Sequence, residues 1–432
     1  MTEQKRKRIV VTGIGWVTPL GHDIETVWKR LLAGDCAIEP TAHFDASTFP
    51  TSFTAQVSDY DHHQFIKRPE AHEGIGRNTS YALGAAVQAW QSAGLDSFDQ
   101  LDRARTGIYL GAGEGVVDFE NYFAANLAGW DNENRCIDPV RWAKAAQEMM
   151  QPVVEVEQEP NMPVSHIAME FDIFGPAYNC LTACAASTQA IGEATEILRR
   201  GDAEVMVAGG AHTMIHPLGV TGFNRLTALS NRNDDYKTAA RPFNRTRDGF
   251  VLGEGAGMLI LETREHAQQR GANVLAEIVG FGSSADSYRI TDIHPEGRGA
   301  VAAMQQAIDN AGLSTKDIDY ISAHGTGTKE NDSIETKGIK VVFGDDAPNI
   351  PVSSIKSMMG HLIAAAGAVE LITCILAIRD NKLPPTINLH DPDPECDLDY
   401  IPNESRDAEV NVCLSNSFGF GGQNNALVVK SP

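Results

Sequence analysis

Short β-branched runs alternate with longer helical patterns along this chain, and the same order occurs twice. In the first half, helical patterns separate strand-like runs at 9–11, 106–110, 177–181 and 203–208. In the second half, they separate strand-like runs at 275–279, 318–323, 410–414 and 426–429. Strands that alternate with helices form mixed or parallel sheets that helices cover. The order therefore predicts an α/β fold of two similar halves, produced by an internal duplication.

We place the domain boundary between the strand-helix pattern of the first half and that of the second half. This gives domains 1–265 and 266–432. The stretch 115–165 interrupts the first half with irregular aromatic, acidic and proline-rich pieces. We interpret this stretch as an elaborated insertion.

Composition and charge exclude several classes of function. Of the 432 residues, 42% are apolar and 21% charged, as in ordinary globular proteins. With 35 basic and 57 acidic residues the net charge is −22, which repels phosphate backbones and argues against nucleic-acid binding. The longest apolar stretch, 360–378, contains His361 and Glu370, which are costly inside a bilayer. We therefore expect a buried core helix there and no membrane span.

The cysteines indicate the compartment. All seven are scattered without a CxxC pair, which suggests a reducing compartment, and the N-terminus lacks the apolar segment of a secretory signal. We expect a cytoplasmic protein. Because HExxH and paired-cysteine motifs are also missing from the sequence, we expect no metal site.

Cys184 has the local setting of a nucleophile. It follows a strand-like run directly and opens a helical pattern, flanked by small residues in the segment TACAAS. Small neighbours permit a sharp strand-to-helix turn, and a helix N-terminus stabilises a thiolate. Such a turn suits acyl transfer. A buried, inert cysteine would share this setting, so the segment alone leaves both interpretations open.

Two histidines lie at comparable places. His324 follows the run 318–323 and precedes Gly-Thr-Gly-Thr, while His361 stands at the head of the apolar stretch 360–378. A helix N-terminus would bias His361 towards neutrality. Each histidine alone could be a turn or capping residue. One cysteine and two histidines at strand ends and helix starts together predict a site for covalent catalysis.

Lys356 and Glu370 are ionisable residues in apolar or tight surroundings. We expect them to form a buried pair that orients the histidines. The alternative is a lysine at a loop exit and a glutamate that faces solvent.

The glycine-rich loops at 111–115 and 419–422 are incomplete as phosphate-binding motifs.

Four motifs in order carry a resemblance to a known family. They are TACAAS around Cys184, HGTGT from His324, KSMMGH ending at His361, and NSFGFGG near the C-terminus. Together they resemble the β-ketoacyl-[acyl-carrier-protein] synthases of the elongating, Cys-His-His type, most closely from about residue 176 to 432. The resemblance implies a thiolase-like fold, with two duplicated halves whose mixed sheets are layered with helices.

The resemblance also implies a reaction, a decarboxylative Claisen condensation in fatty-acid or related polyketide-like biosynthesis. Cys184 would accept an acyl chain as a thioester, and His324 and His361 would stabilise the enolate of malonyl-carrier protein. The implied partners are acyl carrier protein and a second subunit, either a copy of this chain in a homodimer or a related ketosynthase. No cofactor is implied beyond the carrier's phosphopantetheine arm.

Further roles follow from the same resemblance. The backbone N–H groups of Cys184 and Phe420 would form the oxyanion hole, and Phe418 and Phe420 resemble the family's gating loop. The positions that match phosphopantetheine-binding residues are Thr291, Thr326 and Thr328. Because the carrier protein is acidic, we expect a local basic patch, with the candidates Lys67, Arg68 and Arg225.

Two segments depart from the family pattern. Residues 69–83 lack its Met-Asp-x-x-x-Gln-type sequence, and the stretch 115–165 is longer than expected. By resemblance both lie near the dimer interface and the acyl pocket, so they bear on the acyl substrate. The longer stretch adds the aromatic residues Phe119, Tyr122, Phe123, Trp130 and Trp142. These either reshape an acyl tunnel, giving an unusual acyl preference, or belong to an outward loop.

Two other functions remain open at this stage. A non-catalytic partner subunit of a heterodimeric ketosynthase is disfavoured by the presence of Cys184. A thiolase-like acyltransferase would need a second cysteine in the C-terminal glycine loop, whereas Cys413 lies before that loop. His361 stands where initiating synthases carry asparagine, which disfavours a starter enzyme.

Overall fold

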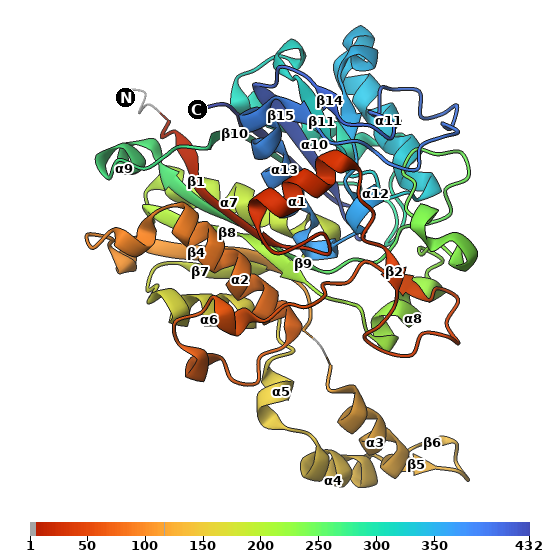
Figure 1. The fold of residues 1–432 in the computed structure, drawn as a ribbon. Coiled ribbons are helices and arrows are strands. Elements are labelled where there is room, and N and C mark those ends of the chain that lie inside the picture. Colours follow the sequence, from red (N-terminus) through yellow and green to blue (C-terminus); the bar gives the residue numbers. More distant parts are fainter. Residues whose placement is uncertain (1–5, 116) are drawn as a thin grey trace.

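One ten-stranded sheet runs through the molecule, and each half of the chain contributes five strands (Figure 1). The computed structural model describes residues 6–115 and 117–432. The strand order is β12-β11-β15-β16-β10-β1-β9-β8-β4-β7. The first-half strands are β1 (Ile9–Val17), β4 (Thr106–Ala112), β7 (Ala177–Cys180), β8 (Val205–His212) and β9 (Gly255–Thr263). The second-half strands are β10 (Ala276–Ala285), β11 (Tyr320–Ser322), β12 (Val352–Ser353), β15 (Val412–Phe418) and β16 (Gln423–Lys430).

The two sets of strands repeat one topology. In the first set β4 pairs in parallel with β7 and β8, and in the second β11 pairs in parallel with β12 and β15. The remaining pairs, β8-β9 and β9-β1 against β15-β16 and β16-β10, are antiparallel in both sets. Antiparallel pairing of β1 with β10 joins the sets at the centre. The predicted duplicated α/β fold with mixed pairing is confirmed.

Helices cover both faces of the sheet, so its central strands are apolar throughout. Every residue of β1 is buried, and its glycines let helix α2 (Arg77–Ser92) approach closely. A Cβ atom at Gly13 would lie 2.1 Å from the carbonyl oxygen of Ala89, and one at Gly15 would lie 2.2 Å from that of Ala85. Strands buried on both faces read as continuous apolar runs, which is the pattern of this sequence.

Two buried helices, α7 (Ala186–Arg200) and α13 (Ala366–Asp380), occupy equivalent places in the two halves. α7 packs against β4 and β8, and α13 packs against β9 and β15. Each helix follows a short 3-10 turn that contains a residue with positive φ, Ala183 at 47° and Ile363 at 48°. The helices meet where a Cβ atom at Gly367 would lie 1.9 Å from Oγ1 of Thr188.

The remaining elements surround this core. The other helices of the body are α1 (Ile24–Ala33), α6 (Met162–Phe171), α8 (Pro217–Arg225), α9 (Arg264–Gln269), α10 (Arg298–Ala311), α11 (Lys329–Phe343) and α12 (Lys356–Met359). Short two-residue strands are β2 (Glu39–Pro40), β3 (Phe53–Thr54), β13 (Lys382–Leu383) and β14 (Arg406–Asp407).

The apolar stretch 360–378 is buried as predicted, but it is not one helix. α12 ends at Met359, Gly360 has a φ of 69°, and α13 begins only at Ala366. His361 therefore lies in an irregular segment, where it forms an isolated bridge with Leu252. The prediction that His361 heads the helix was wrong. No helix within the described residues is both long and apolar enough to cross a membrane.

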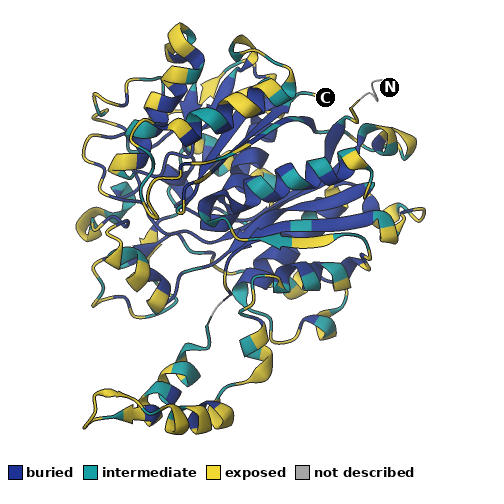
Figure 2. Ribbon diagram, turned by 180° about the vertical axis from the view of Figure 1, so that it is seen from behind, coloured by how far each residue is buried: buried dark blue, intermediate teal, exposed yellow. Residues whose placement is uncertain are grey.

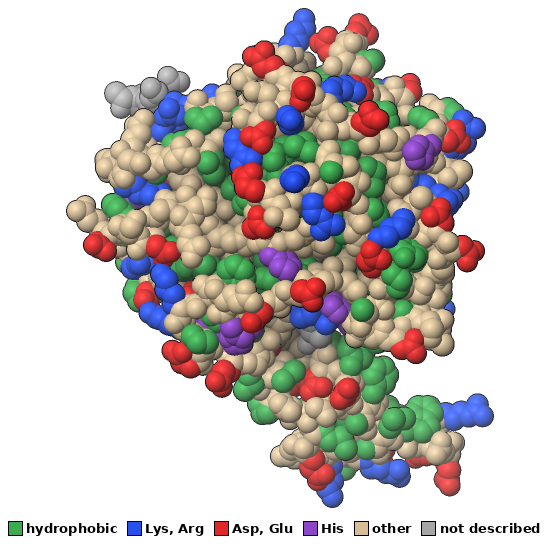
Figure 3. Space-filling view, viewed as in Figure 1, with side chains coloured by type: hydrophobic (Ala, Val, Ile, Leu, Met, Phe, Trp, Pro, Cys, Tyr) green, Lys and Arg blue, Asp and Glu red, His purple; other side chains and the backbone are tan. Residues whose placement is uncertain are grey.

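The residues 117–156 form an arm that projects from the body (Figure 1). They are mostly helical rather than irregular: α3 (Phe119–Gly129), β5 (Trp130–Asp131), β6 (Cys136–Ile137), α4 (Pro139–Met149) and α5 (Pro152–Val156). α3 and α4 pack through Ala125, Ala145 and Ala146, and much of the remaining surface is exposed (Figure 2). Apolar side chains gather on the arm in Figure 3, and those of Leu127 and Val140 are each 77% exposed.

Candidate functional site

Cys184 lies in the 3-10 turn Ala183–Ala185, between β7 and α7. The turn is tight because Ala183 takes a positive φ, and alanines on either side of the cysteine leave room for it. The thiol is buried, and its Sγ atom lies 3.0 Å from Nε2 of His361. The predicted strand-to-helix turn thus places a cysteine and a histidine in contact.

The protonation of Cys184 is decided by burial. Burial raises the pKa of its thiol to about 11, and this outweighs the lowering by Lys356 and by the backbone N–H groups of Phe420 and Cys184 itself. We expected the helix N-terminus to favour a thiolate; in the free protein the thiol form prevails at neutral pH. The backbone N–H groups of Phe420 and Cys184 both lower the pKa of the thiol, so both lie close to Sγ. Their role as an oxyanion hole stays a prediction.

Both histidines are neutral. Burial lowers the pKa of His324 and of His361 well below the ordinary value, and the nearby Lys356 lowers both further. His361 does not owe this neutrality to a helix N-terminus, because it lies outside α13. The two rings meet edge to face with centroids 5.4 Å apart.

The contacts behind each ring determine which nitrogen carries the proton. Nδ1 of His361 accepts a hydrogen bond of 3.2 Å from the N–H of Ile363, and Nζ of Lys356 lies 3.5 Å from Nδ1 of His324. A neutral imidazole that accepts at Nδ1 carries its proton on Nε2. Both histidines therefore present an Nε2–H donor, and that of His361 points at Sγ of Cys184.

Lys356 and Glu370 form the predicted buried pair. Their side chains are 3% and 2% exposed and make an ion pair, and Nζ of Lys356 also donates a 2.6 Å hydrogen bond to the carbonyl oxygen of His324. Burial raises the pKa of Glu370 to about 7, although Lys356 opposes this. The lysine thus links a buried carboxylate to the backbone and ring of His324.

The cysteine and both histidines line a pocket of ≈ 400 Å³. Its lining includes Cys184, His324, His361, Thr291, Thr326, Thr328, Phe418 and Phe420. Of the predicted site residues, Lys356 and Glu370 do not line the pocket, which agrees with their place behind His324. The ring of Phe418 lies 5.7 Å from that of His324, next to the glycine loop. The structure therefore brings the predicted nucleophile, histidines, gate and threonines to one cavity.

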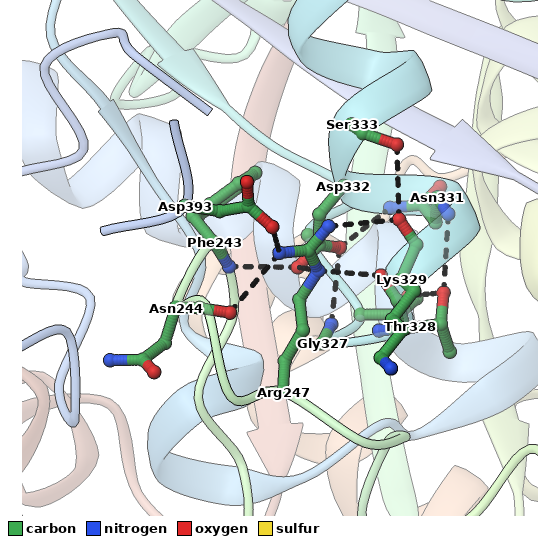
Figure 4. A network of polar contacts seen from close by, with 12 residues as sticks. Phe243, Asn244, Arg247, Gly327, Thr328, Lys329, Asn331, Asp332, Ser333 and Asp393 are labelled. Atoms are coloured by element: carbon green, nitrogen blue, oxygen red, sulfur yellow. Dashed lines mark hydrogen bonds and ion pairs between the residues drawn. The ribbon is translucent and has the colours of Figure 1, made fainter. Parts of the chain in front are cut away.

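Sequence reasoning missed the polar network that supports the HGTGT loop (Figure 4). Arg247 is buried and donates hydrogen bonds to the carbonyl oxygens of Thr328 and Lys329, and it forms ion pairs with Asp332 and Asp393. Buried charges survive only when they are paired and hydrogen-bonded. The charged residues within the segment RPFNRTRDGF were the available signal for this network.

A second missed residue, Glu335, fixes the backbone at His324. Its carboxylate accepts hydrogen bonds of 2.8 Å from the N–H groups of His324 and of Gly325. Burial raises the pKa of Glu335, and these N–H groups oppose that rise. Together with Arg247, this residue holds both ends of the HGTGT loop.

Two groups of side chains have the spacing of metal ligands within residues 6–115 and 117–432. In each group the ligand atoms lie within 4.8 Å of one another: Cys184 with His324 and His361, and the more exposed Asp61 with His62 and His63. The first group coincides with the pocket end, where a metal would occupy the nucleophile.

The candidates for a basic docking patch separate. Arg225 is exposed next to Leu226, which lines the pocket. Lys67 forms an ion pair with Asp96, and Arg68 forms one with Asp172; neither Lys67 nor Arg68 lines the pocket.

Cys413 is fully buried and absent from the pocket lining, which removes the thiolase-like arrangement of two cysteines.

Family models match both halves of the chain. The model described as "Beta-ketoacyl synthase, N-terminal domain" matches residues 6–267, and the "Beta-ketoacyl synthase, C-terminal domain" matches residues 275–390. A protein of Coxiella burnetii named 3-oxoacyl-[acyl-carrier-protein] synthase 2 is 40% identical, over 98% of this chain and 99% of its own. The protein of the same name from Staphylococcus aureus strain N315 is 41% identical, over 99% of both chains.

Solved structures agree on the fold. A beta-ketoacyl synthase from Burkholderia phymatum superposes with a TM-score of 0.88 at 33% identity, covering 99% of this chain and 100% of that one. The ketosynthase of a type II polyketide complex, AntDE:AntF, superposes with a TM-score of 0.86 at 32% identity, with the same coverage. The thiolase-like fold is thus confirmed. The two models and the near-complete coverage at 40–41% identity show that this chain belongs to the β-ketoacyl synthase family.

Proposed function

We propose that this protein condenses a Cys184-bound acyl chain with malonyl-acyl carrier protein to give 3-ketoacyl-acyl carrier protein. The observation that carries the proposal is the convergence of Cys184 with two neutral histidines in the lining of one pocket. The names of the curated relatives, 3-oxoacyl-[acyl-carrier-protein] synthase 2, support fatty-acid biosynthesis as the pathway.

The first half-reaction is acyl transfer to the cysteine. Sγ of Cys184 attacks the thioester carbonyl carbon of the acyl-carrier, the bond to the carrier's sulfur breaks, and the thiol proton ends on that departing sulfur. The backbone N–H groups of Cys184 and Phe420 stabilise the oxyanion that forms in between. The high pKa of Cys184 matches a thiol that loses its proton as it attacks.

The second half-reaction is decarboxylative condensation. The malonyl carboxylate leaves as carbon dioxide, and its bonding electron pair becomes an enolate whose oxygen accepts hydrogen bonds from Nε2–H of His324 and His361. The enolate carbon attacks the acyl carbonyl, and Sγ of Cys184 leaves as a thiolate that takes up a proton from solvent. A neutral histidine keeps its proton through this cycle, which suits a donor role and agrees with the lowered pKa of both rings.

Further roles complete the proposal. Thr291, Thr326 and Thr328 would hold the phosphopantetheine arm, because their side chains line the same pocket. Phe418 and Phe420 would gate it, and Lys356 with Glu370 would orient His324. These steps use the enzyme and its carrier-bound substrates, with no metal or other cofactor.

The proposed partners are acyl carrier protein and a second subunit. One related solved structure is titled as a ketosynthase with its acyl-carrier protein, and another as a ketosynthase with its chain length factor. In this chain β7 forms the edge of the described sheet, flanked by the exposed side chains of Phe174, Tyr178 and Leu181. An unpaired apolar edge strand favours pairing with another chain. We favour a homodimer, with a related ketosynthase subunit as the alternative.

We infer a cytoplasmic location. The seven cysteines are all free in the structure, as expected in a reducing compartment.

The function is tested by following the two half-reactions separately. Intact-mass analysis after incubation with acyl-carrier proteins should show one acyl group on the wild-type chain and none on Cys184→Ala, whose circular dichroism should be unchanged. Cys180→Ala, at a partly buried cysteine four positions earlier, is the matched control and should acylate like wild type. Acylation of the Cys184→Ala chain, or wild-type protein that neither acylates nor forms 3-ketoacyl product, would overturn the proposal.

A further inference from the structure

Two segments that depart from the family pattern meet in the folded protein and form a buried chain of ionisable side chains. His72 comes from residues 69–83, and Glu157 comes from the stretch 115–165. The last residues of that stretch begin α6, which carries His166 and Glu170. All four side chains are at most 7% exposed. None of them takes part in the proposed condensation.

The four side chains contact one another in the order Glu157, His166, His72, Glu170, and we call this set the line. Oε1 of Glu157 lies 2.8 Å from Nε2 of His166, and Nδ1 of His166 lies 2.8 Å from Nδ1 of His72. At the other end, Nε2 of His72 lies 3.0 Å from Oε2 of Glu170. Each contact has hydrogen-bond length, so each needs one proton between its two atoms.

Counting those protons defines the charge of the line. Three contacts take three protons, which corresponds to two carboxylates, one imidazolium and one neutral imidazole, with a net charge of −1. A fourth proton would set an N–H against an N–H between the rings. With only two protons, one contact would join two lone pairs. Buried groups without a hydrogen-bond partner are costly, so both changes weaken the line.

Charged, titratable and hydrogen-bonding groups also lie next to the four side chains. His62 and Arg68 are the charged or titratable neighbours on the side of His72 and Glu170, and the head of Arg68 is paired with Asp172. Oγ1 of Thr79 donates a hydrogen bond of 3.4 Å to Oε2 of Glu157 from helix α2. The N–H of Lys67 donates a 2.6 Å hydrogen bond to Oε1 of Glu170, while its ammonium pairs with Asp96. The nearby cations Lys67 and Arg68 thus already have carboxylate partners outside the line.

The line is attached to the root of the arm, by which we mean the two chain ends near Gly115 and Glu157. Glu157 caps the C-terminus of α5, and next to it the carbonyl oxygen of Gln158 accepts a 2.9 Å hydrogen bond from the N–H of Gly115. The outgoing and returning ends of the arm are thus joined beside Glu157. A Cβ atom at Gly115 would lie only 2.4 Å from the carbonyl oxygen of Glu157.

The arm root also borders the apolar residues around Cys184. The ring of Phe119, at the start of α3, lies 5.3 Å from that of His216. His216 caps α8 and follows Ile215, which belongs to the buried apolar cluster that contains Cys184. A Cβ atom at Gly113 would lie 2.2 Å from Nε2 of His212. Burial lowers the pKa of His212 and His216 to about 4, so both stay neutral while the line changes its protons.

We propose that Glu157, His166, His72 and Glu170 are positioning residues that hold the arm root against His216, beside the apolar cluster that contains Cys184, by sharing three protons. The arm is held most firmly when each of the three contacts has its proton, and it is released when a proton is gained or lost. The role in substrate choice rests on the proposed function: a displaced Phe119 alters the wall near His216 and disfavours long acyl chains more than short ones.

The proton count is tested on the wild-type protein, without reference to activity. Side-chain nitrogen NMR of ¹⁵N-histidine-labelled protein should show, near neutral pH, one imidazolium and one neutral ring at His72 and His166, assigned by single substitution. Two neutral rings or two imidazolium rings at that pH would overturn the proposal.

The positioning role is tested with His166→Gln and His72→Gln, with His63→Gln at the exposed surface as matched control. Hydrogen–deuterium exchange within 117–156 should rise about tenfold or more in both buried variants, and its dependence on pH beyond the intrinsic rate should disappear. Acylation by long-chain carrier substrates should fall at least fivefold, while short-chain acylation and malonyl decarboxylation stay within twofold. Arm exchange and pH profile like those of wild type in a folded variant would contradict the role. Should both variants fail to fold, Thr79→Val removes one contact to Glu157 and should raise arm exchange in the same direction.

Discussion

Burial and neighbouring atoms determine the protonation of Cys184, His324 and His361. The N–H of Ile363 and the ammonium of Lys356 face Nδ1 of His361 and His324, so the Nε2–H groups of both rings are available at the reacting atoms. Burial keeps both rings neutral and raises the pKa of the Cys184 thiol to about 11. A site of two neutral donors and one thiol favours the stabilisation of negative charge on a substrate oxygen over abstraction of a substrate proton.

From this arrangement we expect His324→Ala and His361→Ala to impair decarboxylation more than acylation of Cys184. Each removes one donor to the enolate oxygen, and loss of a single oxyanion donor lowers the rate on the order of a hundredfold or more. Single-turnover acylation by mass spectrometry and release of carbon dioxide should be measured separately. Equal losses in the two half-reactions would contradict the assignment of both donors to the enolate.

Glu370 should make stability depend on pH. Burial raises its pKa from 4.5 to about 7, so the folded chain binds this proton more tightly than the unfolded chain does. The stabilisation is complete below pH 4.5 and is lost as the pH rises through about 7. We expect the unfolding free energy of wild type to fall relative to that of Glu370→Gln as the pH rises through that window. Urea titrations at several pH values measure it, and a constant difference would refute the expectation.

At the scale of elements, what the sequence predicts depends on whether the signal is local. Cys184 and His324 were predictable because each comes shortly after a strand and adjoins small residues. The pair of Lys356 with Glu370 was predictable because Glu370 interrupts the apolar stretch 360–378 and Lys356 precedes it closely. By contrast His72 and His166 lie 94 positions apart, and the packing of α6 against the 3-10 turn Pro69–His72 brings them together.

The start of α13 could not be read from hydrophobicity either. Residues 362–369 are all apolar or glycine, so the pattern has no boundary at Ala366. The backbone conformation at Gly360 and Ile363 makes the boundary. That boundary is functional, since it frees the ring of His361 to reach Cys184. The helix α3 was missed because its apolar residues do not gather on one face, whereas the amphipathic pattern of α4 could have predicted that helix.

The crossing of α7 and α13 sets the distance between Cys184 and His361. At Gly367 a Cβ atom would lie 1.9 Å from Oγ1 of Thr188, so we expect Gly367→Ala to push the helices apart. Overpacking of this kind costs about 1–3 kcal/mol of unfolding free energy. Calorimetry should show that loss together with slower acylation. Gly76→Ala, where nothing lies within 4 Å of the added atom, is the control and should leave both unchanged.

At the scale of the whole molecule, the net charge of −22 opposes an acidic carrier protein, so productive docking must depend on local cations. Arg225 is the predicted candidate that adjoins the pocket lining, whereas Lys67 is paired with Asp96 and does not line the pocket. We therefore expect Arg225→Glu to raise KM for carrier-bound substrates with little change in kcat. Lys67→Glu makes the same change of net charge and separates local docking from global repulsion. The difference between the two variants should be largest at low salt and fade as ionic strength rises, because exposed charges are screened within about 10 Å at 0.1 M. Equal KM values for the two variants at every ionic strength would mean that only the total charge of the molecule matters, and that Arg225 has no special place in docking.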